Sequence, residues 1–287
     1  MISEAEAPLC LPPRALTRLP ATRLPFGTVD THFHVFKPGA PLNSPRSYTP
    51  QILTLADWQH LAATLGIDCG VLVQPSVYGF DNSVLLEALA AAPRHLRGVV
   101  VLPPETPLDE LKRLDLLGVR GVRINTRNKG GLPFSTVADF AKPLAALGWT
   151  LQFQVRPEQL PIITALAPTL GAPVVIDHLG FIPLGTPETE DHVTNLQRLL
   201  DTGRAYVKLS APYRLTTGAD HSAFAHVAAR LVQSHPQRLL WATDWPHTEL
   251  WADMPDDADL IEEALGWLST DAIRQTVFVD NPQSLFF

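Results

Sequence analysis

The feature that most constrains the fold of this 287-residue chain is a repeated alternation of short apolar runs with longer amphipathic stretches. Each run is rich in aliphatic and β-branched residues, which is typical of parallel strands covered on both faces. The predicted strands span residues 28–32, 69–74, 98–102, 121–125, 150–154, 174–178, 205–209 and 239–243. The predicted helices span residues 57–66, 82–91, 109–118, 137–148, 157–170, 191–203, 222–235 and 257–268.

Eight strands, each followed by a helix, are the elements of a (β/α)8 TIM barrel. A doubly wound open sheet is the alternative, but it needs fewer strands, and no glycine-rich nucleotide loop follows the first one. We therefore predict an α/β TIM barrel that forms a single domain over residues 26–287. Residues 1–25 are expected to be a tail, or a strap across the bottom of the barrel.

Charge and cysteine content narrow the class of protein. The formal net charge of −7 argues against a nucleic-acid-binding protein, which would normally carry a basic surface. Cys10 and Cys69 are too few for a disulfide framework and fit a reducing compartment. The first 25 residues lack the apolar segment of a signal peptide, and no apolar run is long enough to span a membrane. We expect a cytoplasmic protein without nucleic-acid or membrane partners, and a homo-oligomer is possible.

Histidine and aspartate gather where three predicted strands end, and this is the end at which TIM barrels carry their reactive groups. The first strand runs into DTHFH (30–34), the sixth into DH (177–178) and the eighth into TDWPH (243–247). His32 and His34 are two residues apart, so on an extended chain both face the same side. A single histidine at a strand end is more often structural, but this combination favours a catalytic set. The set consists of His32, His34, His178 and Asp244.

A group of cations is predicted on the same face of the barrel. Arg123 ends the fourth strand, Lys129 follows it, and Arg214 lies after the seventh. In an acidic protein these cations indicate an anionic substrate, since arginine binds carboxylates through two parallel hydrogen bonds. They could equally be solvated or paired with nearby acids. The hydroxyls of Tyr48 and Ser76 could add neutral contacts.

Several segments of the chain together resemble the amidohydrolase-related lactonases, and within them the 2-pyrone-4,6-dicarboxylate lactonase group. These segments are VDTHFHVF (29–36), GVRGVRIN (118–125), VVIDHLG (174–180), WATDWPH (241–247) and VDNP (279–282). The likeness extends from about residue 26 to the C-terminus. It implies a hydrolase that opens a carboxylated lactone in the catabolism of aromatic compounds, with 2-pyrone-4,6-dicarboxylate or a close analogue as the substrate. It also implies catalysis without a bound metal.

The resemblance further implies roles for individual residues. Asp244 would activate water, and His32, His34 and His178 would polarise the lactone carbonyl. The residues expected to contact the substrate are Arg123, Lys129, Arg214, Tyr48, Ser76 and His247. Two positions depart from the family pattern, because Lys129 replaces an arginine and Ser76 a threonine. Lysine lacks the planar fork of arginine, so the identity of the lactone stays open.

A metal and three other functions remain as alternatives. His32, His34, His178 and Asp244 could ligate one Zn²⁺ or another divalent ion, with water in an open position. We expect no cofactor, and this expectation follows from the resemblance. The alternative reactions are the isomerisation of a sugar-diacid lactone, as in galactarolactone isomerases, and a metal-dependent amidohydrolase or decarboxylase reaction. A non-catalytic anion-binding protein is a third alternative, but it would leave Asp244 and the histidine pair unexplained.

Overall fold

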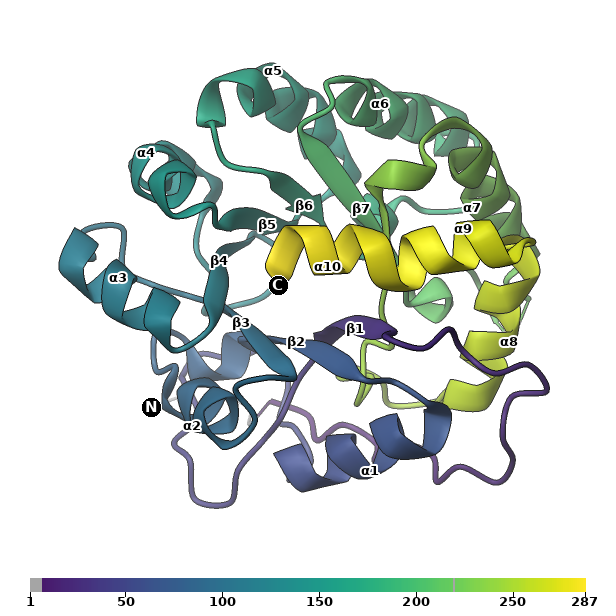
Figure 1. The fold of residues 1–287 in the computed structure, drawn as a ribbon, viewed down its shortest axis with the longest axis horizontal. Helices are drawn as coiled ribbons and strands as arrows, with labels where there is room; N and C mark the ends of the chain where they lie inside the picture. Colours follow the sequence, from purple (N-terminus) through teal and green to yellow (C-terminus); the bar gives the residue numbers. More distant parts are fainter. Residues whose placement is uncertain (1–6, 219) are drawn as a thin grey trace, which may run out of the picture.

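The strands form one parallel sheet that curves into a nearly closed barrel. The computed structural model describes residues 7–218 and 220–287, and the strands follow one another in the order β1 to β8 (Figure 1). They are β1 (Val29–Phe33), β2 (Cys69–Val73), β3 (Leu96–Val100), β4 (Val119–Asn125), β5 (Thr150–Gln154), β6 (Val174–Ile176), β7 (Ala205–Leu209) and β8 (Leu239–Trp241). A parallel bridge between Phe33 and Trp245 joins the two ends of the sheet. The predicted single TIM barrel is confirmed.

Helices surround the sheet, as expected for a TIM barrel (Figure 1). They are α1 (Leu55–Leu65), α2 (Ser83–Ala91), α3 (Leu108–Leu116), α4 (Val137–Leu147), α5 (Leu160–Leu170), α6 (Thr189–Asp201), α7 (Ser222–Ser234) and α8 (Asp257–Trp267). Each predicted helix is present, with its ends shifted by a few residues. At the end of α1, Gly66 adopts a left-handed conformation with φ of 82°, which suits glycine best. Within the described ranges, no helix has both the length and the apolar character needed to cross a membrane.

Shorter elements connect and complete the barrel. Single-turn 3₁₀ helices are found at Ser76–Tyr78, Phe134–Thr136, Pro157–Gln159, Pro212–Arg214 and Pro236–Arg238, and a left-handed turn at His178–Phe181. After α8 the chain continues into α9 (Asp271–Gln275), a π-helical turn (Thr276–Asp280) and α10 (Asn281–Phe286). The sequence analysis did not predict this C-terminal helical segment. It lies across one opening of the barrel (Figure 1).

The barrel interior is apolar at the end where the strands begin. Val29, Val71, Val175 and Leu240 are fully buried and pack in one cluster with Phe286 of α10. Because side chains of a strand alternate between its two faces, these residues mark the inward-facing positions of their strands. The C-terminal helix therefore closes this end of the barrel with an aromatic side chain, and the opposite end remains for the functional site.

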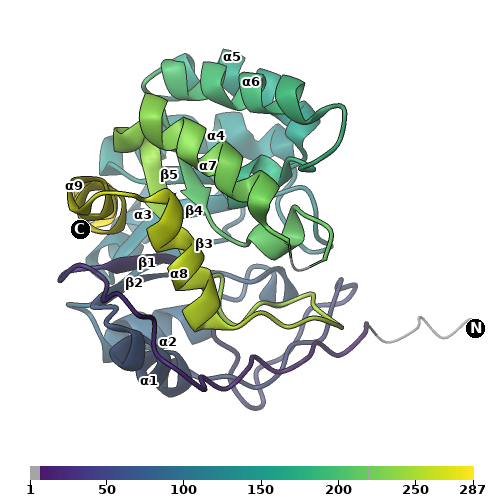
Figure 2. The same ribbon diagram turned by 90° about the vertical axis from the view of Figure 1, so that its right-hand side faces the viewer.

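The N-terminal segment runs along the side of the barrel. Its start pairs with the β1–α1 loop through a bridge between Leu9 and Thr49, and the Leu11 N–H donates to the Leu250 carbonyl at 2.9 Å. Arg18 forms ion pairs with Asp259 and Glu262 of α8. Figure 2 shows this segment reaching the end opposite to α9 and the C-terminus. The described part of the segment is thus not a strap across the barrel bottom, which α10 covers.

Candidate active site

Two sequence motifs meet where the barrel closes, and Asp30 joins them. Its carboxylate accepts hydrogen bonds from the Thr243 N–H at 3.0 Å and the Thr243 hydroxyl at 2.6 Å. It also accepts from the indole N–H of Trp58 at 3.1 Å. In addition, the Asp244 N–H donates to the His32 carbonyl at 2.9 Å. Hydrogen bonds between the DTH and TDW motifs therefore hold His32 beside Asp244.

A β-bulge directs both histidines of the first motif inward. Asp30 pairs with Gly70 and Phe33 with Leu72, so three steps along β1 match two steps along β2. Phe33 consequently faces outward and stacks on the Trp58 ring at a centroid distance of 3.9 Å. His32 and His34 face the interior, with 3.3 Å between their Nε2 atoms. The two histidines do share a side, as the sequence predicted.

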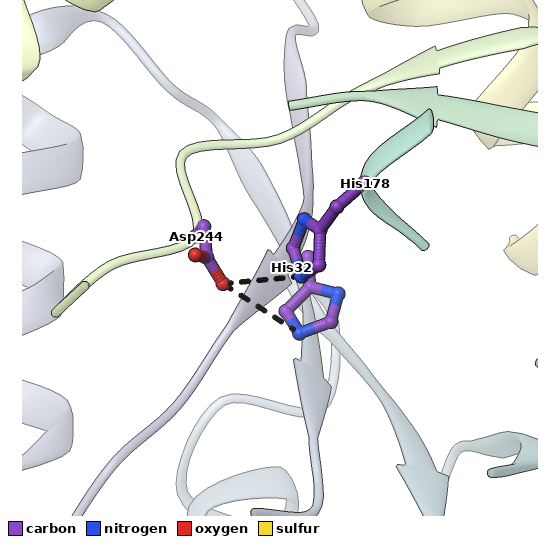
Figure 3. Close-up of side chains that lie close together, drawn as sticks. All are labelled: His32, His178 and Asp244. Atoms are coloured by element: carbon purple, nitrogen blue, oxygen red, sulfur yellow. Dashed lines mark ion pairs between the residues drawn. The ribbon is translucent and has the colours of Figure 1, made fainter. Parts of the chain in front are cut away.

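The four predicted catalytic residues lie together at the C-terminal end of the barrel. Asp244 Oδ1 lies 3.4 Å from His178 Nε2 and 3.9 Å from His32 Nε2, with all three side chains almost fully buried (Figure 3). His178 and Asp244 both adopt left-handed backbone conformations, with φ of 46° and 62°. Such strain in non-glycine residues is concentrated at functional sites.

Hydrogen bonding determines which nitrogen of His34 carries a proton. Nδ1 lies 2.7 Å from the Val73 carbonyl, which can only accept, so Nδ1 must be protonated. Burial, together with the nearby Arg123, lowers the pKa of His34 to about 3, so the ring is neutral. Nε2 of His34 therefore carries a lone pair and can only accept a hydrogen bond. A hydrogen bond between the two Nε2 atoms then requires a proton on His32 Nε2. His32 Nδ1 lies 3.2 Å both from Lys208 Nζ, which can donate to that tautomer, and from Asp177 Oδ1, which would accept from the other one.

His178 has the opposite arrangement. Its Nδ1 lies 2.9 Å from the Ser210 hydroxyl, which can donate to it. Its Nε2 faces the carboxylate of Asp244, which accepts when ionised. Burial lowers the pKa of His178 to about 4, so this ring is also neutral. His178 therefore presents an N–H group towards Asp244, whereas His34 presents a lone pair.

The two oxygens of Asp244 have different surroundings. Oδ2 accepts from Arg214 Nε at 2.8 Å and from the Tyr213 hydroxyl at 2.7 Å. Oδ1 faces His32 and His178. Burial alone would raise the pKa of this carboxyl, but Arg214, together with His178, His32 and His34, outweighs burial and holds the pKa well below the ordinary value. Asp244 is thus an ionised carboxylate that is anchored through one oxygen.

A buried ionic network lies beneath these residues, centred on Asp177. Its carboxylate lies 3.1 Å from Lys208 Nζ, 3.2 Å from Arg123 Nη2 and 3.1 Å from Gln152 Nε2. Burial opposes ionisation of Asp177, but Lys208, His32 and Arg123 hold its pKa well below the ordinary value. Burial also lowers the pKa of Lys208 to about 8. The sequence analysis gave Lys208 no role; its signal was a lysine within an otherwise apolar strand.

A small cavity with an empty volume of about 280 Å³ opens above the network. It is lined by His34, Tyr48, Ser76, Arg123, Asn128, Gln154, His178, Phe181, Arg214, Asp244, Thr248 and Glu249. These residues come from the ends of most strands, as in TIM-barrel enzymes. The structure therefore brings together seven of the predicted residues and adds others, notably Asn128, Gln154 and Glu249, that the sequence analysis did not single out.

Three predicted residues lie elsewhere. His32 is fully buried below the cavity, in contact with His34 and Lys208. His247 is also fully buried, and its Nδ1 lies 2.9 Å from the hydroxyl of Tyr213, behind Asp244. Lys129 is exposed, and its backbone N–H donates to the Ser47 hydroxyl at 3.1 Å. Direct substrate contacts by His247 and Lys129 thus remain predictions.

Comparison with known proteins assigns the family. The amidohydrolase family model matches residues 29–287. This chain belongs to the amidohydrolase family. It is 33% identical over 283 residues to the 2-pyrone-4,6-dicarboxylate hydrolase of Comamonas testosteroni, covering 93% of this chain and 92% of the relative. It is 32% identical over 291 residues to the 4-sulfomuconolactone hydrolase of Rhizobium radiobacter, covering 99% and 97%.

A solved structure agrees with this assignment. It is a crystal structure from Acinetobacter baumannii of a protein described as a "probable 2-pyrone-4,6-dicarboxylic acid hydrolase", with citric acid bound. Its TM-score against this amidohydrolase is 0.82 at 26% identity, and the match covers 91% of this chain and 99% of that one. The predicted family resemblance is confirmed.

The two arginines of this amidohydrolase differ in their capacity to bind a ligand. A guanidinium has five N–H donors. Four of those of Arg123 have protein acceptors, two of them on Asp177. Among the described residues, Arg214 donates to Asp244 Oδ2 and to the Thr248 carbonyl, so three of its donors remain for a ligand. Arg214 is therefore the better anion-binding group.

The donor atoms of this amidohydrolase also fit a divalent cation. One atom from each of His32, His178 and Asp244 lies within 4.8 Å of the others. Ligands of a tetrahedral zinc ion lie about 3.3 Å apart, given bonds of about 2.0–2.1 Å. The lone pair on His34 Nε2 lies 3.3 Å from His32 Nε2 and could serve as a fourth ligand. A bound ion would share the site with the cationic groups of Lys208 and Arg214.

Proposed function

We propose that this amidohydrolase hydrolyses a lactone that carries at least one carboxylate. The observation that carries this proposal is that Asp244, His178 and Arg214 line the same small cavity. They supply a base, a hydrogen-bond donor and an anion-binding cation, which are the groups needed to open an anionic cyclic ester. The two relatives described above, which are named as lactone hydrolases, support the same reaction class.

In this mechanism Asp244 acts on water. Oδ1 takes a proton as the water oxygen attacks the lactone carbonyl, while Arg214 and Tyr213 hold Oδ2 in place. The tetrahedral intermediate then collapses with cleavage of the bond between the carbonyl carbon and the ring oxygen. Asp244 returns the proton to the departing ring oxygen. One water is consumed, and the new carboxylic acid loses its remaining proton to solvent to become a carboxylate.

His178 is the donor for the developing oxyanion. Its Nε2–H already points towards the reacting side of Asp244, and Ser210 stabilises this tautomer. Removing one such donor typically lowers kcat by about 100- to 1000-fold. His34 has a different role, because its Nε2 accepts while the ring is neutral. The prediction that all three histidines donate to the carbonyl is therefore narrowed to His178.

The substrate carboxylate would bind the three remaining donors of Arg214. Tyr48 and Ser76 line the same cavity and could position the lactone ring through their hydroxyls. Holding the ring at a fixed angle to the attacking water lowers the entropic part of the barrier. The predicted substrate 2-pyrone-4,6-dicarboxylate has a second carboxylate, and Lys129, one of the cations expected to contact the substrate, is exposed.

We propose that the reaction proceeds without a metal, since His178 and Arg214 can stabilise negative charge on the substrate. Were a divalent ion bound, His32, His178 and Asp244 would hold it, and it would supply a Lewis acid at the carbonyl. Lys208 and Arg214 occupy the immediate surroundings of these ligands and would oppose a further positive charge.

The test is a turnover screen across carboxylated lactones, with purified enzyme before and after treatment with a chelator, together with metal analysis. We expect release of the open-chain acid that is unaffected by the chelator. A rearranged lactone in place of the free acid would favour the isomerase alternative, which would use the same base and cations. A stoichiometric metal whose removal abolishes activity would contradict the metal-independent mechanism.

A further inference from the structure

The charges that line the cavity are balanced. Arg123 and Arg214 contribute two positive charges, and Asp244 and Glu249 contribute two negative ones. Asp244 follows from the proposed mechanism, but Glu249 has no part in it. A carboxylate inside a cavity that binds an anion is unfavourable unless it recognises another group of the ligand, because like charges at a binding site repel.

Glu249 differs from the other cavity charges because it makes no close ion pair among the described residues, although its charge acts to raise the pKa of the nearby Arg127 and Arg214. Arg123 is paired with Asp177, and Arg214 with Asp244. Glu249 Oε1 accepts a hydrogen bond from the neutral side-chain amide of Asn128 at 2.5 Å. Among the described residues, no ion pair includes Glu249. Its carboxylate therefore keeps its capacity to accept further hydrogen bonds from a ligand.

The position of Glu249 is built by several segments of the chain. Its backbone is left-handed, with φ of 60°, and its N–H donates to Cys10 Sγ at 3.2 Å. The next residue, Leu250, accepts from the Leu11 N–H at 2.9 Å. On the other side, Asn128 accepts through Oδ1 from the Gln154 amide at 2.9 Å. The loop that carries Glu249 is therefore strained and is held by contacts with the N-terminal segment and the β4–α4 loop. Such strain indicates a specific role for Glu249.

The cavity thus offers two different subsites. One is cationic, at Arg214, which retains three N–H donors. The other accepts hydrogen bonds, at Glu249. Lys129, which was expected to contact the substrate, is exposed on its loop and is not among the residues that line the cavity.

We propose that Glu249 is a specificity-determining residue that selects lactones with a single carboxylate and a hydroxyl group. The carboxylate would bind Arg214, and the hydroxyl would donate to Glu249. This inference rests on the proposed function and names its substrate class. Lactones of sugar acids have both groups, whereas 2-pyrone-4,6-dicarboxylate would place a second anion near Glu249.

A binding experiment tests the inference without depending on turnover. The probes are 3-hydroxybenzoate and benzene-1,3-dicarboxylate, two stable rings that differ only in whether the second group is a hydroxyl or a carboxylate. Calorimetric titration should show that the enzyme binds 3-hydroxybenzoate about tenfold more tightly or better. Glu249→Gln keeps the side-chain size and removes the charge, so it should raise the affinity for the dicarboxylate about tenfold.

Glu105→Gln is the matched control, because Glu105 is an exposed acid in the loop after β3, outside the cavity lining. This variant should leave the affinity ratio of the two probes unchanged. An unchanged ratio in Glu249→Gln would overturn the role of Glu249. Tighter binding of the dicarboxylate by the unaltered enzyme, or binding of neither probe, would overturn it as well.

A turnover comparison extends the test to substrates. The specificity constant kcat/KM should be higher for D-galactarolactone than for 2-pyrone-4,6-dicarboxylate, and Glu249→Gln should reduce that ratio about tenfold or more. The reverse preference, unaffected by the substitution, would contradict the inference while leaving lactone hydrolysis intact. If neither lactone reacts but the binding results hold, the proposed reaction fails and the role of Glu249 in selecting ligands stands.

Discussion

The two halves of the barrel interior are built from the same strands and have opposite chemistry. Where the strands begin, Val29, Val71 and Val175 pack in one hydrophobic cluster with Phe286. Where they end, Asp177 and Lys208 are fully buried and form an ion pair of 3.1 Å. The change occurs between Val175 of β6 and Asp177, which follows the end of that strand and is the next inward-facing position.

This contrast shows how one barrel divides stability and function between its two ends. Apolar burial at the closed end contributes free energy through the hydrophobic effect and tolerates imperfect geometry better. Buried charges at the open end cost desolvation energy and are stable only when every group has its partner. We therefore expect substitutions at the open end to affect activity or stability sharply, and those at the closed end to affect stability alone.

The largest effect is expected for Asp244→Asn at the open end. The amide cannot accept the proton of the attacking water, so kcat/KM should fall by roughly 100- to 10,000-fold. Steady-state kinetics on the lactone found by the screen would measure it. Asp109→Asn is the control, since the Asp109 side chain is 95% exposed on α3. Near-normal turnover by Asp244→Asn would show that Asp244 is not the general base.

The next effect concerns the stability of the ionic network. Asp177→Asn leaves Lys208 and Arg123 buried without their carboxylate, so the free energy of unfolding should fall by about 3–5 kcal/mol. The double variant Asp177→Asn with Lys208→Met should recover a large part of this loss, because it removes one of the uncompensated charges. Urea denaturation of the four members of the cycle gives the coupling energy. Additive losses in the double variant would show that the two residues are not coupled.

At the closed end, Phe286→Ala should lower the free energy of unfolding by about 3 kcal/mol through loss of aromatic burial. The folded enzyme should retain kcat/KM within about twofold, since Phe286 packs among valines far from Asp244 along the barrel. Leu116→Ala serves as the control for a lost apolar side chain, because Leu116 is 87% exposed. A large loss of kcat/KM in the folded Phe286→Ala enzyme would show that the closed end also contributes to activity.

The smallest effect, measured per pH unit, is in the pH dependence of stability. Burial lowers the pKa of His34 to about 3 and that of His178 to about 4, from 6.5. Below pH 6.5 the unfolded chain therefore binds protons that the folded chain does not, so stability is lost as the pH falls towards 4. Each histidine should contribute a slope of up to about 1.4 kcal/mol per pH unit. In His178→Gln this slope should decrease; an unchanged slope would mean that His178 is not buried as a neutral ring.

Much of the fold and of the site could be predicted from local patterns. The apolar runs defined the strands because parallel strands are buried on both faces, and glycines such as Gly66 marked helix ends. The four residues His32, His34, His178 and Asp244 followed from motifs at strand ends. What could not be predicted is the environment of each group. The sequence of β7, for example, does not show which of its residues face the barrel interior, so it does not show that Lys208 is paired with Asp177 there.

Other features depend on contacts between segments that are distant along the chain. Glu249 enters the cavity because Cys10 and Leu11 hold its loop, and no local pattern near residue 249 indicates that contact. Phe286 closes the barrel because the C-terminal helix crosses its opening, although the helix itself is short. The exposed position of Lys129 is likewise set by its loop.

The sequence by itself determined that this chain forms a TIM barrel and that histidines and an aspartate meet at one end, because both follow from periodicity and from the common direction of parallel strands. Only the tertiary structure decided what those groups can do. It sets the tautomers of His34 and His178 through the acceptor oxygens of Val73 and Asp244, and it places Arg214 and Glu249 in one cavity. Proton positions and charge balance depend on atoms a few ångströms apart, and folding alone brings such atoms together.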